Sequence, residues 1–351
     1  MSPAIFMQRS IDLALRGAGY VAPNPMVGAV LVHEGTIIGE GWHQRHGEAH
    51  AEPNCIASVK AEHRHLIPQS TMYVTLEPCA HFGRTPPCAD LLIAQKVAKV
   101  VIGCLDPFKK VDGRGVEKLK AAGIETELNV LEKECRDLNK RFLTFHTLHR
   151  PYIVLKWAET ADGIIGAAAG EDRLLISNEY TNRLVHRWRS EEASILVGTN
   201  TALQDDPALT TRSWEGPSPI RLVIDKELRL PSTLKLFDRS VRTIVFNTVK
   251  HEERDNLLYY QVTNDVNLVH QIVNALYQLN IQSVLVEGGA QLLQSFIDEG
   301  LWDEARIVRN NELKHTRGLP APVLSNAYKT DTQLLISDTI ELFKPSKVHH
   351  N

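Results

Sequence analysis

The feature that most constrains the fold of this chain is a set of potential metal ligands that are far apart in the sequence. His50 lies two residues before Glu52, and the thiols of Cys79 and Cys88 come later in the chain. One imidazole and two thiolates can hold a zinc ion with a fourth position open, whereas structural zinc is closed by four protein ligands. If these three ligands share one metal, the fold must bring the segments around residues 50, 79 and 88 together.

The local sequence places the ligands at the ends of predicted elements. His50 opens an apolar helical pattern that runs to Ala61, and Pro53 is tolerated because it falls in the first turn. Cys79 follows the strand-like run Thr71–Thr75, and Cys88 begins a predicted helix to Gln95. Helix N-termini stabilise thiolates and lower their pKa, so these junctions suit metal binding.

The spacing of the cysteines leaves alternatives open. Zinc deaminases carry His-x-Glu followed by Pro-Cys-x-x-Cys, with the Glu as acid and base rather than as a ligand. In this chain Phe82 stands where the second Cys would fall, so the third ligand is Cys88 or His81. We prefer Cys88, because a His two residues from Cys79 folds back onto the same metal only with strain. The cysteines could also be buried small apolar residues, and Glu52 an exposed carboxylate at a helix N-terminus.

Composition bounds the class of protein. The chain has 351 residues, which exceeds what one core usually supports, so two globular domains are expected. No apolar run approaches the length of about 18 residues that a membrane span needs, and Met1–Met7 lacks the basic region of a signal peptide. Five cysteines do not suggest a disulfide framework, and a net charge of -3 argues against nucleic-acid binding. We expect a cytoplasmic protein that acts on a small molecule, without membrane or nucleic-acid partners.

The first domain is predicted to span residues 1–149, as an α/β layer structure with crossover connections. It ends before Pro151, which stops the preceding helix. The predicted helices are Met7–Ala18, His50–Ala61, Cys88–Gln95, Val116–Ala122 and Leu131–Leu148, and the predicted strands are Val27–Val32, Thr36–Gly39, Thr71–Thr75, Val97–Gly103 and Ile124–Leu128.

The second domain is predicted to span residues 150–351 and to repeat this alternation. Its predicted strands are Tyr152–Ala158, Ser194–Val197, Ile220–Ile224, Thr243–Phe246 and Ser283–Val286, and its predicted helices are Tyr180–Arg189, Val266–Leu279 and Ala290–Glu299. Residues after Asn310 carry little signal.

Several motifs of the first domain resemble the family of bifunctional riboflavin-biosynthesis deaminase/reductases. They are Ala22–Gly28, Gly41–His43, His50–Glu52, Thr75–Cys79 and His81–Cys88. The long loop between the two cysteines departs from the general deaminase pattern and is what this family shows.

This resemblance implies a cytidine-deaminase-like α/β/α domain in which His50, Cys79 and Cys88 bind zinc and Glu52 transfers protons. It also implies that Asn24 and His43 contact the substrate and that Asp106 lies on its ribose side. The chain departs from the family after Asp106-Pro107, where the family usually continues Asn-Pro and this chain has Phe108-Lys109. One sugar or phosphate contact is therefore in doubt, although Lys109 or Lys110 could supply a phosphate partner.

The second domain gives weaker signals by itself. No Gly-x-Gly-x-x-Gly is present, so an ordinary Rossmann fingerprint is excluded. Gly288-Gly289 joins a strand to a helix whose N-terminus can hold a phosphate, or it forms a tight turn without a ligand. Lys156 lies in an apolar strand, where it can be a site residue or a snorkelling surface residue. Arg189 and Arg212 can bind a phosphate or form ordinary ion pairs.

The second half is similar to the reductase half of the same family, which implies a dihydrofolate-reductase-like α/β fold and NADPH as cofactor. The resemblance implies that the cofactor is bound by Ala158, Thr201, Asp205, Gly288 and Gly289. It implies that Arg189 and Arg212 bind the substrate phosphate. Lys156, Asp205 and Glu287 would surround the carbon that accepts the hydride. Glu287 would then contact the substrate. Lys226 is a possible partner for the 2′-phosphate, but no motif separates NADPH from NADH.

Together these observations predict two consecutive steps of riboflavin synthesis, zinc-dependent deamination of a pyrimidine ribotide and reduction of its ribosyl side chain to ribityl. A homodimer is expected on general grounds. One rival hypothesis is a nucleoside or tRNA deaminase with an appended nucleotide-binding domain. The other is a zinc-stabilised regulatory module without chemistry, which would have a closed four-ligand zinc.

Overall fold

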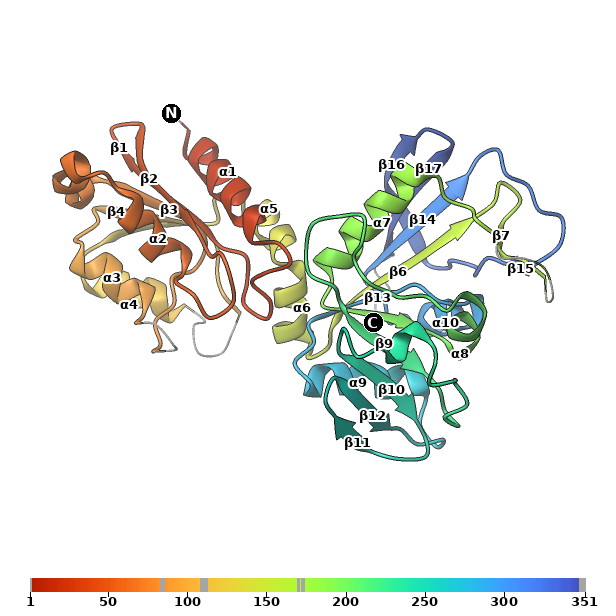
Figure 1. The fold of residues 1–351 in the computed structure, drawn as a ribbon. Coiled ribbons are helices and arrows are strands. Elements are labelled where there is room, and N and C mark those ends of the chain that lie inside the picture. Colours follow the sequence, from red (N-terminus) through yellow and green to blue (C-terminus); the bar gives the residue numbers. More distant parts are fainter. Residues whose placement is uncertain (1, 83–85, 108–112, 169–170, 172–173, 347–351) are drawn as a thin grey trace. The chain divides into compact units, whose positions relative to one another are not determined.

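The computed structural model describes residues 2–82, 86–107, 113–168, 171 and 174–346 (Figure 1). The chain divides into two compact units, Met1–His149 and Arg150–Asn351, and each has its own sheet and core. The division falls where His149 adopts a left-handed backbone conformation, with φ at 53°, directly before Arg150-Pro151.

The first unit is built on one mixed sheet. Its described strands run in the order β2-β1-β3-β4-β5, with β1 antiparallel to β2 and β3 and the last three strands parallel. The strands are β1 Gly28–His33, β2 Thr36–Trp42, β3 Thr71–Leu76, β4 Lys99–Cys104 and β5 Glu125–Leu128. The helices are α1 Pro3–Ala14, α2 Ala51–Ser58, α3 Cys88–Ala94, α4 Arg114–Ala121, α5 Glu132–Leu138 and α6 Lys140–Leu148, with 3₁₀ turns at Leu15–Gly17 and Ala61–Gln69.

Helices cover both faces of this sheet, so the unit has three layers (Figure 1). Successive side chains of a strand point to opposite faces. Ala29 and Leu31 of β1 therefore pack in the cluster that includes α2, α3 and α4, whereas Val30 and Val32 pack with α1 and α5. The expected cytidine-deaminase-like α/β/α domain is confirmed.

A glycine allows α2 to lie directly on the sheet. A Cβ at Gly41 of β2 would lie 2.2 Å from the Cys55 backbone nitrogen and 2.6 Å from the Ala51 carbonyl oxygen. No side chain fits in that space, so Gly41 sets the distance between β2 and the helix. This contact fixes the first turn of α2, which holds Glu52 and follows His50.

Three predicted helices differ from the structure. The helix predicted over Met7–Ala18 is found at Pro3–Ala14 and is followed by a 3₁₀ turn. The predicted continuous helix Leu131–Leu148 is wrong, because it is interrupted at Asn139 between α5 and α6. The Asn139 side chain is buried and bonds both the backbone N–H and the carbonyl of Met26, each at 2.8 Å. The helix predicted to reach Ala61 ends at Ser58.

The second unit contains a large sheet whose described strands run in the order β11-β12-β10-β9-β8-β13-β6-β14-β17-β16. The strands are β6 Tyr152–Glu159, β8 Ser194–Val197, β9 Ile220–Ile224, β10 Thr243–Asn247, β11 Glu252–Arg254, β12 Leu257–Gln261, β13 Ser283–Val286, β14 Glu304–Asn310, β16 Ala327–Leu335 and β17 Asp338–Pro345, and a separate pair is β7 Ile164–Gly166 with β15 Leu319–Pro320. The helices are α7 Glu179–Glu191, α8 Thr199–Asp205, α9 Leu268–Gln278 and α10 Ala290–Asp298, with a 3₁₀ turn at Lys235–Phe237.

The middle of this sheet is parallel, from β12 through β10, β9, β8, β13 and β6 to β14. The carboxyl ends of β8, β13 and β6 therefore meet at one edge, which is where open α/β sheets bind ligands. Both faces of the parallel strands are apolar and covered. The α/β class expected for the second domain is confirmed.

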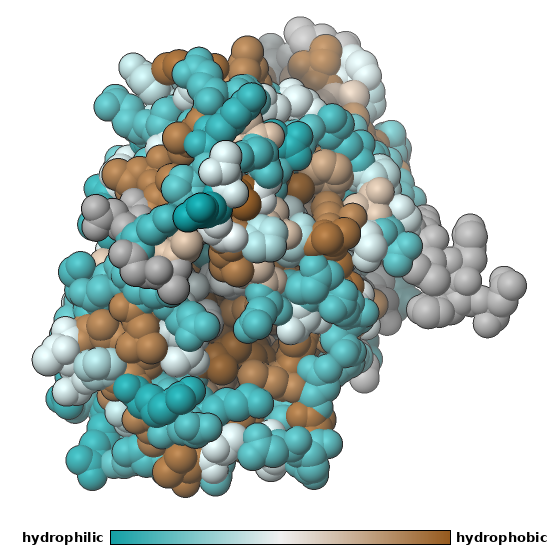
Figure 2. Space-filling model, turned by 90° about the vertical axis from the view of Figure 1, so that its right-hand side faces the viewer, coloured by the Kyte–Doolittle hydropathy of each residue, from teal (hydrophilic) through white to brown (hydrophobic). Residues whose placement is uncertain are grey.

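On the face in Figure 2, hydrophilic residues cover most of the surface, with hydrophobic residues in smaller groups between them. Among the described residues, no helix has the length and apolar character needed to cross a bilayer.

The buried Asn139 generates a stability prediction. We expect Asn139→Ala to destabilise the first unit by about 2 kcal/mol, because the N–H and carbonyl of Met26 lose their partner in a buried position. Hydrogen exchange measured by mass spectrometry on the whole chain should show faster exchange in peptides around Met26 and no change in the second unit. Asn311→Ala, which removes an exposed side chain, is the control. Unchanged exchange near Met26 would contradict this account.

Candidate functional sites

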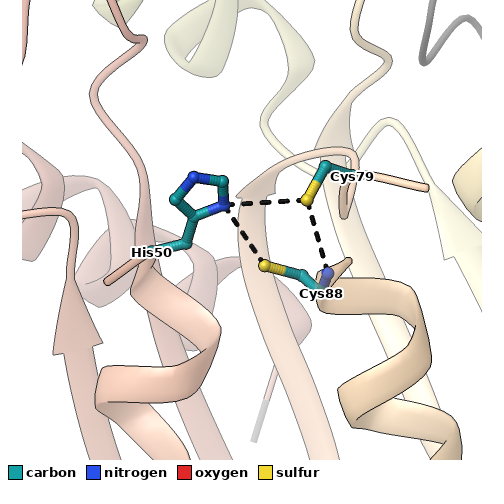
Figure 3. Close-up of side chains that lie close together, drawn as sticks. All are labelled: His50, Cys79 and Cys88. Atoms are coloured by element: carbon teal, nitrogen blue, oxygen red, sulfur yellow. Dashed lines mark hydrogen bonds between the residues drawn. The ribbon is translucent and has the colours of Figure 1, made fainter. Parts of the chain in front are cut away.

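Three side chains of the first unit converge on one point (Figure 3). His50 Nδ1 lies 3.3 Å from Cys88 Sγ and 3.6 Å from Cys79 Sγ, and the three ligand atoms are all within 4.8 Å of one another. A tetrahedral zinc shell with ordinary bond lengths separates nitrogen from sulfur by about 3.5 Å. The donor set and its spacing therefore fit zinc. Among the described residues, three neighbouring side chains could hold a metal ion together, and they are His50, Cys79 and Cys88. The third ligand of this group is Cys88, not His81.

The predicted junctions explain how these side chains meet. His50 is the residue before α2, Cys79 follows β3 after a short connection, and Cys88 is the first residue of α3. The Cys88 backbone N–H donates to Cys79 Sγ at 3.3 Å. The start of α3 thus supplies both a ligand and a hydrogen bond to the other sulfur.

The protonation states of the two thiols favour metal binding. The hydrogen bond from the Cys88 thiol, opposed by burial and reinforced by His50, holds the pKa of Cys79 at about 4. Donation of that bond and burial raise the pKa of Cys88. Cys79 is therefore the thiolate of the pair, and binding of a divalent metal would release the proton of the second thiol.

Glu52 lies beside this cluster in the first turn of α2 and is only 3% exposed. The alternative of an exposed helix-terminal carboxylate is therefore wrong. Burial, and then the charge of Cys79, raise the pKa of Glu52 to about 7. A divalent cation in the cluster would favour the ionised form again, which leaves a carboxylate able to accept a proton.

Asn24 and His43 lie together next to His50. The Asn24 side-chain nitrogen is 3.1 Å from His43 Nε2, and the rings of His43 and His50 are edge to face at 5.4 Å. His43 Nδ1 lies 3.0 Å from the Ala49 carbonyl, which can only accept, so the proton is on Nδ1 and Nε2 accepts from Asn24. Burial lowers the pKa of His43, which favours this neutral form.

Sequence reasoning missed Glu77, which organises the segment after β4. Among the described residues, its buried carboxylate accepts four backbone hydrogen bonds of 2.9 to 3.3 Å, from the N–H groups of Asp106, Gly113, Gly115 and Val116. No local sequence pattern predicts that Glu77 binds these segments, because the hydrogen-bond donors are backbone groups. The only signal is a carboxylate between an apolar strand and Pro-Cys.

Glu77 therefore joins three segments. It follows β3, it binds the residue after β4 that was predicted to face the ribose, and it caps the start of α4. A Cβ at Gly115 would lie 2.0 Å from the Pro78 carbonyl oxygen, so only glycine allows α4 this close. The predicted phosphate partners Lys109 and Lys110, with Phe108, lie outside the described residues.

In the second unit, residues predicted to bind the cofactor meet at the carboxyl ends of β8 and β13. A Cβ at Gly288 would lie 2.8 Å from the Val197 Cα, and one at Gly289 would lie 3.5 Å from Thr201 Oγ1. The Gly288 backbone thus lies directly against the end of β8, and Gly289 faces the Thr201 side chain of α8. Such a cradle of glycine backbone suits the close approach of a dinucleotide phosphate.

Glu287, at the end of β13, forms a bidentate pair with Arg189 of α7. Arg189 Nε donates to Oε1 at 3.1 Å and Nη2 donates to Oε2 at 2.6 Å. Burial alone would raise the pKa of Glu287, but Arg189 and then Lys156 outweigh it and hold the pKa at about 2. Glu287 is therefore ionised at neutral pH. A substrate phosphate would have to use the remaining amino group of Arg189 or displace this carboxylate.

The other predicted residues of this unit have different settings. Ala158 is half-buried near the end of β6, and Asp205 is half-buried as the last residue of α8. Arg212 is exposed in the segment after α8. Lys226 follows β9, where its carbonyl accepts from the Thr248 backbone N–H.

Two family models match the chain. The cytidine and deoxycytidylate deaminase zinc-binding region matches residues 2–104, and the RibD C-terminal domain matches residues 151–310. The first match contains the His50, Cys79 and Cys88 cluster, and the second contains the carboxyl-end residues of β6, β8 and β13.

Curated relatives and solved structures resemble the chain over nearly its whole length. It is 40% identical to the riboflavin biosynthesis protein RibD of Aquifex aeolicus, over 85% of this chain and 84% of the relative. It is 37% identical to RibD of Escherichia coli K12, over 87% and 86%. The structure of a diaminohydroxyphosphoribosylaminopyrimidine deaminase/5-amino-6-(5-phosphoribosylamino)uracil reductase from Thermotoga maritima superimposes with a TM-score of 0.89 at 35% identity, covering 97% and 98%. Acinetobacter baumannii RibD gives 0.87 at 32%, covering 98% and 99%.

The choice between the two candidate third ligands can be tested directly. We expect Cys88→Ala to lose zinc, because two ligands bind it far more weakly than three, whereas His81→Ala should keep a full complement. Zinc per chain is measured by mass spectrometry after gel filtration in the presence of a weak chelator. Loss of zinc from the His81 variant with retention in the Cys88 variant would reverse the assignment.

The four hydrogen bonds to Glu77 predict a large stability effect. Glu77→Ala leaves four N–H groups without their acceptor, so the first unit should lose about 3 kcal/mol or more. Thermal melting followed by release of zinc to a chromogenic chelator reports on this unit alone. Glu117→Ala, which changes an exposed residue of α4, should leave the midpoint in place. Equal midpoints for both variants would show that Glu77 does not hold these segments.

Proposed function

The chain belongs to the family of bifunctional riboflavin-biosynthesis deaminase/reductases, and we propose that it acts on the family's pyrimidine ribotide in two consecutive steps. The first step removes the 2-amino group of 2,5-diamino-6-ribosylamino-4(3H)-pyrimidinone 5′-phosphate as ammonia. The second reduces the ribosyl side chain to ribityl with NADPH. The observation that carries the first step is a buried carboxylate beside a three-ligand cluster whose spacing fits zinc.

In the deaminase unit, His50, Cys79 and Cys88 would hold zinc, which supplies a Lewis acid that lowers the pKa of a water molecule. Glu52 then takes a proton from the attacking water and returns it to a ring nitrogen. It takes the second water proton and gives it to the amino group, whose bond to carbon breaks as ammonia leaves, so that the water oxygen remains on the carbon as a carbonyl. One carboxylate serves first as base and then as acid.

Asn24 and His43 would orient the pyrimidine in this reaction. His43 Nδ1–H donates to the Ala49 carbonyl. This bond fixes the ring and leaves Nε2 as an acceptor. Asn24 keeps its side-chain oxygen for a donor on the substrate while its nitrogen binds His43. Asp106, whose backbone is held by Glu77, would face the ribose.

In the reductase unit, NADPH supplies the hydride, and Ala158, Thr201, Asp205, Gly288 and Gly289 would bind it. The support is the close approach of the Gly288 backbone to the end of β8, at the carboxyl ends of the parallel strands, with Thr201 beside Gly289. Glu287 is ionised and neighbours Lys156, so it cannot donate a proton and instead orients the lysine. The Lys156 ammonium would then protonate the substrate beside the carbon that accepts hydride, with Asp205 near it.

Arg189 and Arg212 would bind the substrate phosphate. Arg189 would use the amino group that is not bonded to Glu287, and the planar guanidinium of Arg212 can offer two parallel donors. Free thiols persist most readily in a reducing compartment, and two-fold dimers are the commonest assemblies. A cytoplasmic homodimer is therefore the assembly that we propose.

Glu52→Gln tests the deaminase assignment. The amide cannot accept the water proton, so ammonia release should fall by at least about a thousandfold while zinc content stays unchanged. Ammonia and NADPH consumption are followed separately, with the diaminopyrimidine ribotide as first substrate and its deaminated product as second. Reduction of the deaminated product should proceed at the wild-type rate, which makes the second unit an internal control. Undiminished ammonia release from this variant would overturn the role of Glu52, and turnover of cytidine instead of the ribotide would overturn the substrate.

A further inference from the structure

The segment that carries Arg212 is held against α7 by a histidine outside the proposed chemistry. His186 Nδ1 accepts a hydrogen bond from the Arg212 backbone N–H at 3.1 Å. The imidazole is buried, and the two residues are 26 positions apart. The bond therefore fixes a loop onto a helix.

This imidazole is neutral at neutral pH. Burial, and then the charges of Arg189 and Arg212, lower the pKa of His186 to about 4, although Glu287 opposes them. A backbone N–H can only donate, so Nδ1 carries the lone pair and Nε2 carries the proton. A protonated ring would lose this acceptor and would repel both guanidinium groups.

Further contacts hold the same loop on the same face of α7. The ring of Trp214 lies under the guanidinium groups of Arg183 and Arg187, at 5.6 and 5.7 Å. A Cβ at Gly216 would lie 2.7 Å from the Ser190 Cβ, so the loop backbone contacts the helix there. The α7 residues in these contacts, Arg183, His186, Arg187 and Ser190, are three or four positions apart and so lie on the same side of the helix. One face of α7 therefore contacts the loop at Arg212, Trp214 and Gly216.

We propose that His186 is a positioning residue for the phosphate group of the reductase substrate. This inference rests on the proposed function, in which Arg189 and Arg212 bind that phosphate. Arg189 belongs to α7 itself, so the helix sets one guanidinium directly and the other through the imidazole. Two guanidinium groups bind one phosphate together when their separation is fixed before binding, because the side chains then need not be ordered by the phosphate.

Substitutions at residue 186 can separate the hydrogen bond from the bulk of the ring. Asn places its polar atoms near the position of Nδ1, whereas Gln reaches the position of Nε2 and Leu has no acceptor. His186→Gln and His186→Leu should raise the KM for the phosphorylated substrate by about fivefold to tenfold, the effect of one neutral hydrogen bond. His186→Asn should stay within about twofold of wild type, since it keeps the bond. Inhibition by inorganic phosphate should weaken in parallel.

Other readouts distinguish positioning from a general structural role. The kcat of the reductase, the KM for NADPH and the ammonia released by the first unit should not change in any of these variants. His270→Asn, which alters an exposed histidine of α9, is the matched control. Equal substrate KM values for the Gln and Asn variants would overturn the inference, as would a parallel loss of kcat and NADPH affinity.

Arg212→Ala separates this inference from the proposed function. A raised substrate KM in Arg212→Ala together with a wild-type KM in His186→Gln would overturn the role of the histidine alone. An unchanged substrate KM in Arg212→Ala would remove Arg212 from phosphate binding, and the inference would fail with it.

Discussion

The first unit depends on one geometric requirement, that an imidazole and two sulfurs from separate segments lie within 4.8 Å of one another. The order β1-β3-β4 places the end of β3 in the middle of the sheet, and α2 and α3 bring His50 and Cys88 to it. Gly41 is needed because α2 must lie directly on β2. Glu77 lies between β3 and Cys79, and its carboxylate binds backbone N–H groups of the segment after β4. It therefore fixes that segment next to the metal ligands. The same packing buries Glu52, and burial raises the pKa of its carboxylate, which suits the role of base and acid that we propose for it.

The site proposed in the second unit depends on buried charges. Parallel strands bring Lys156 and Glu287 to neighbouring carboxyl ends, and Arg189 reaches the same carboxylate from α7. A buried carboxylate between two cations stays ionised, so Glu287 cannot donate a proton, and our proposal gives that role to Lys156. The neutral His186 extends this arrangement to Arg212 without adding a third positive charge.

The zinc cluster could be predicted from sequence because its signals are local, namely ligand residue types at the ends of strongly patterned strands and helices. The interruption at Asn139 could not, because the partner of that side chain is Met26, 113 residues away. Glu77 was missed because it binds backbone N–H groups, which no side-chain pattern reveals. The hairpin of β16 and β17 was missed because β16 is largely exposed and lacks an alternating apolar pattern. Arg189 was predicted as a phosphate ligand from resemblance, but its pairing with Glu287 joins positions 98 residues apart and needed coordinates.

The central claim is an open, three-ligand zinc beside a carboxylate that does not bind the metal. X-ray absorption at the zinc edge of the full chain measures this most directly. The account predicts two sulfur neighbours at about 2.3 Å, one imidazole nitrogen at about 2.0 Å and one further light atom from water, with the same spectrum for Glu52→Gln. A shell closed by four protein ligands, or a spectrum that loses an oxygen neighbour in the Glu52 variant, would contradict it.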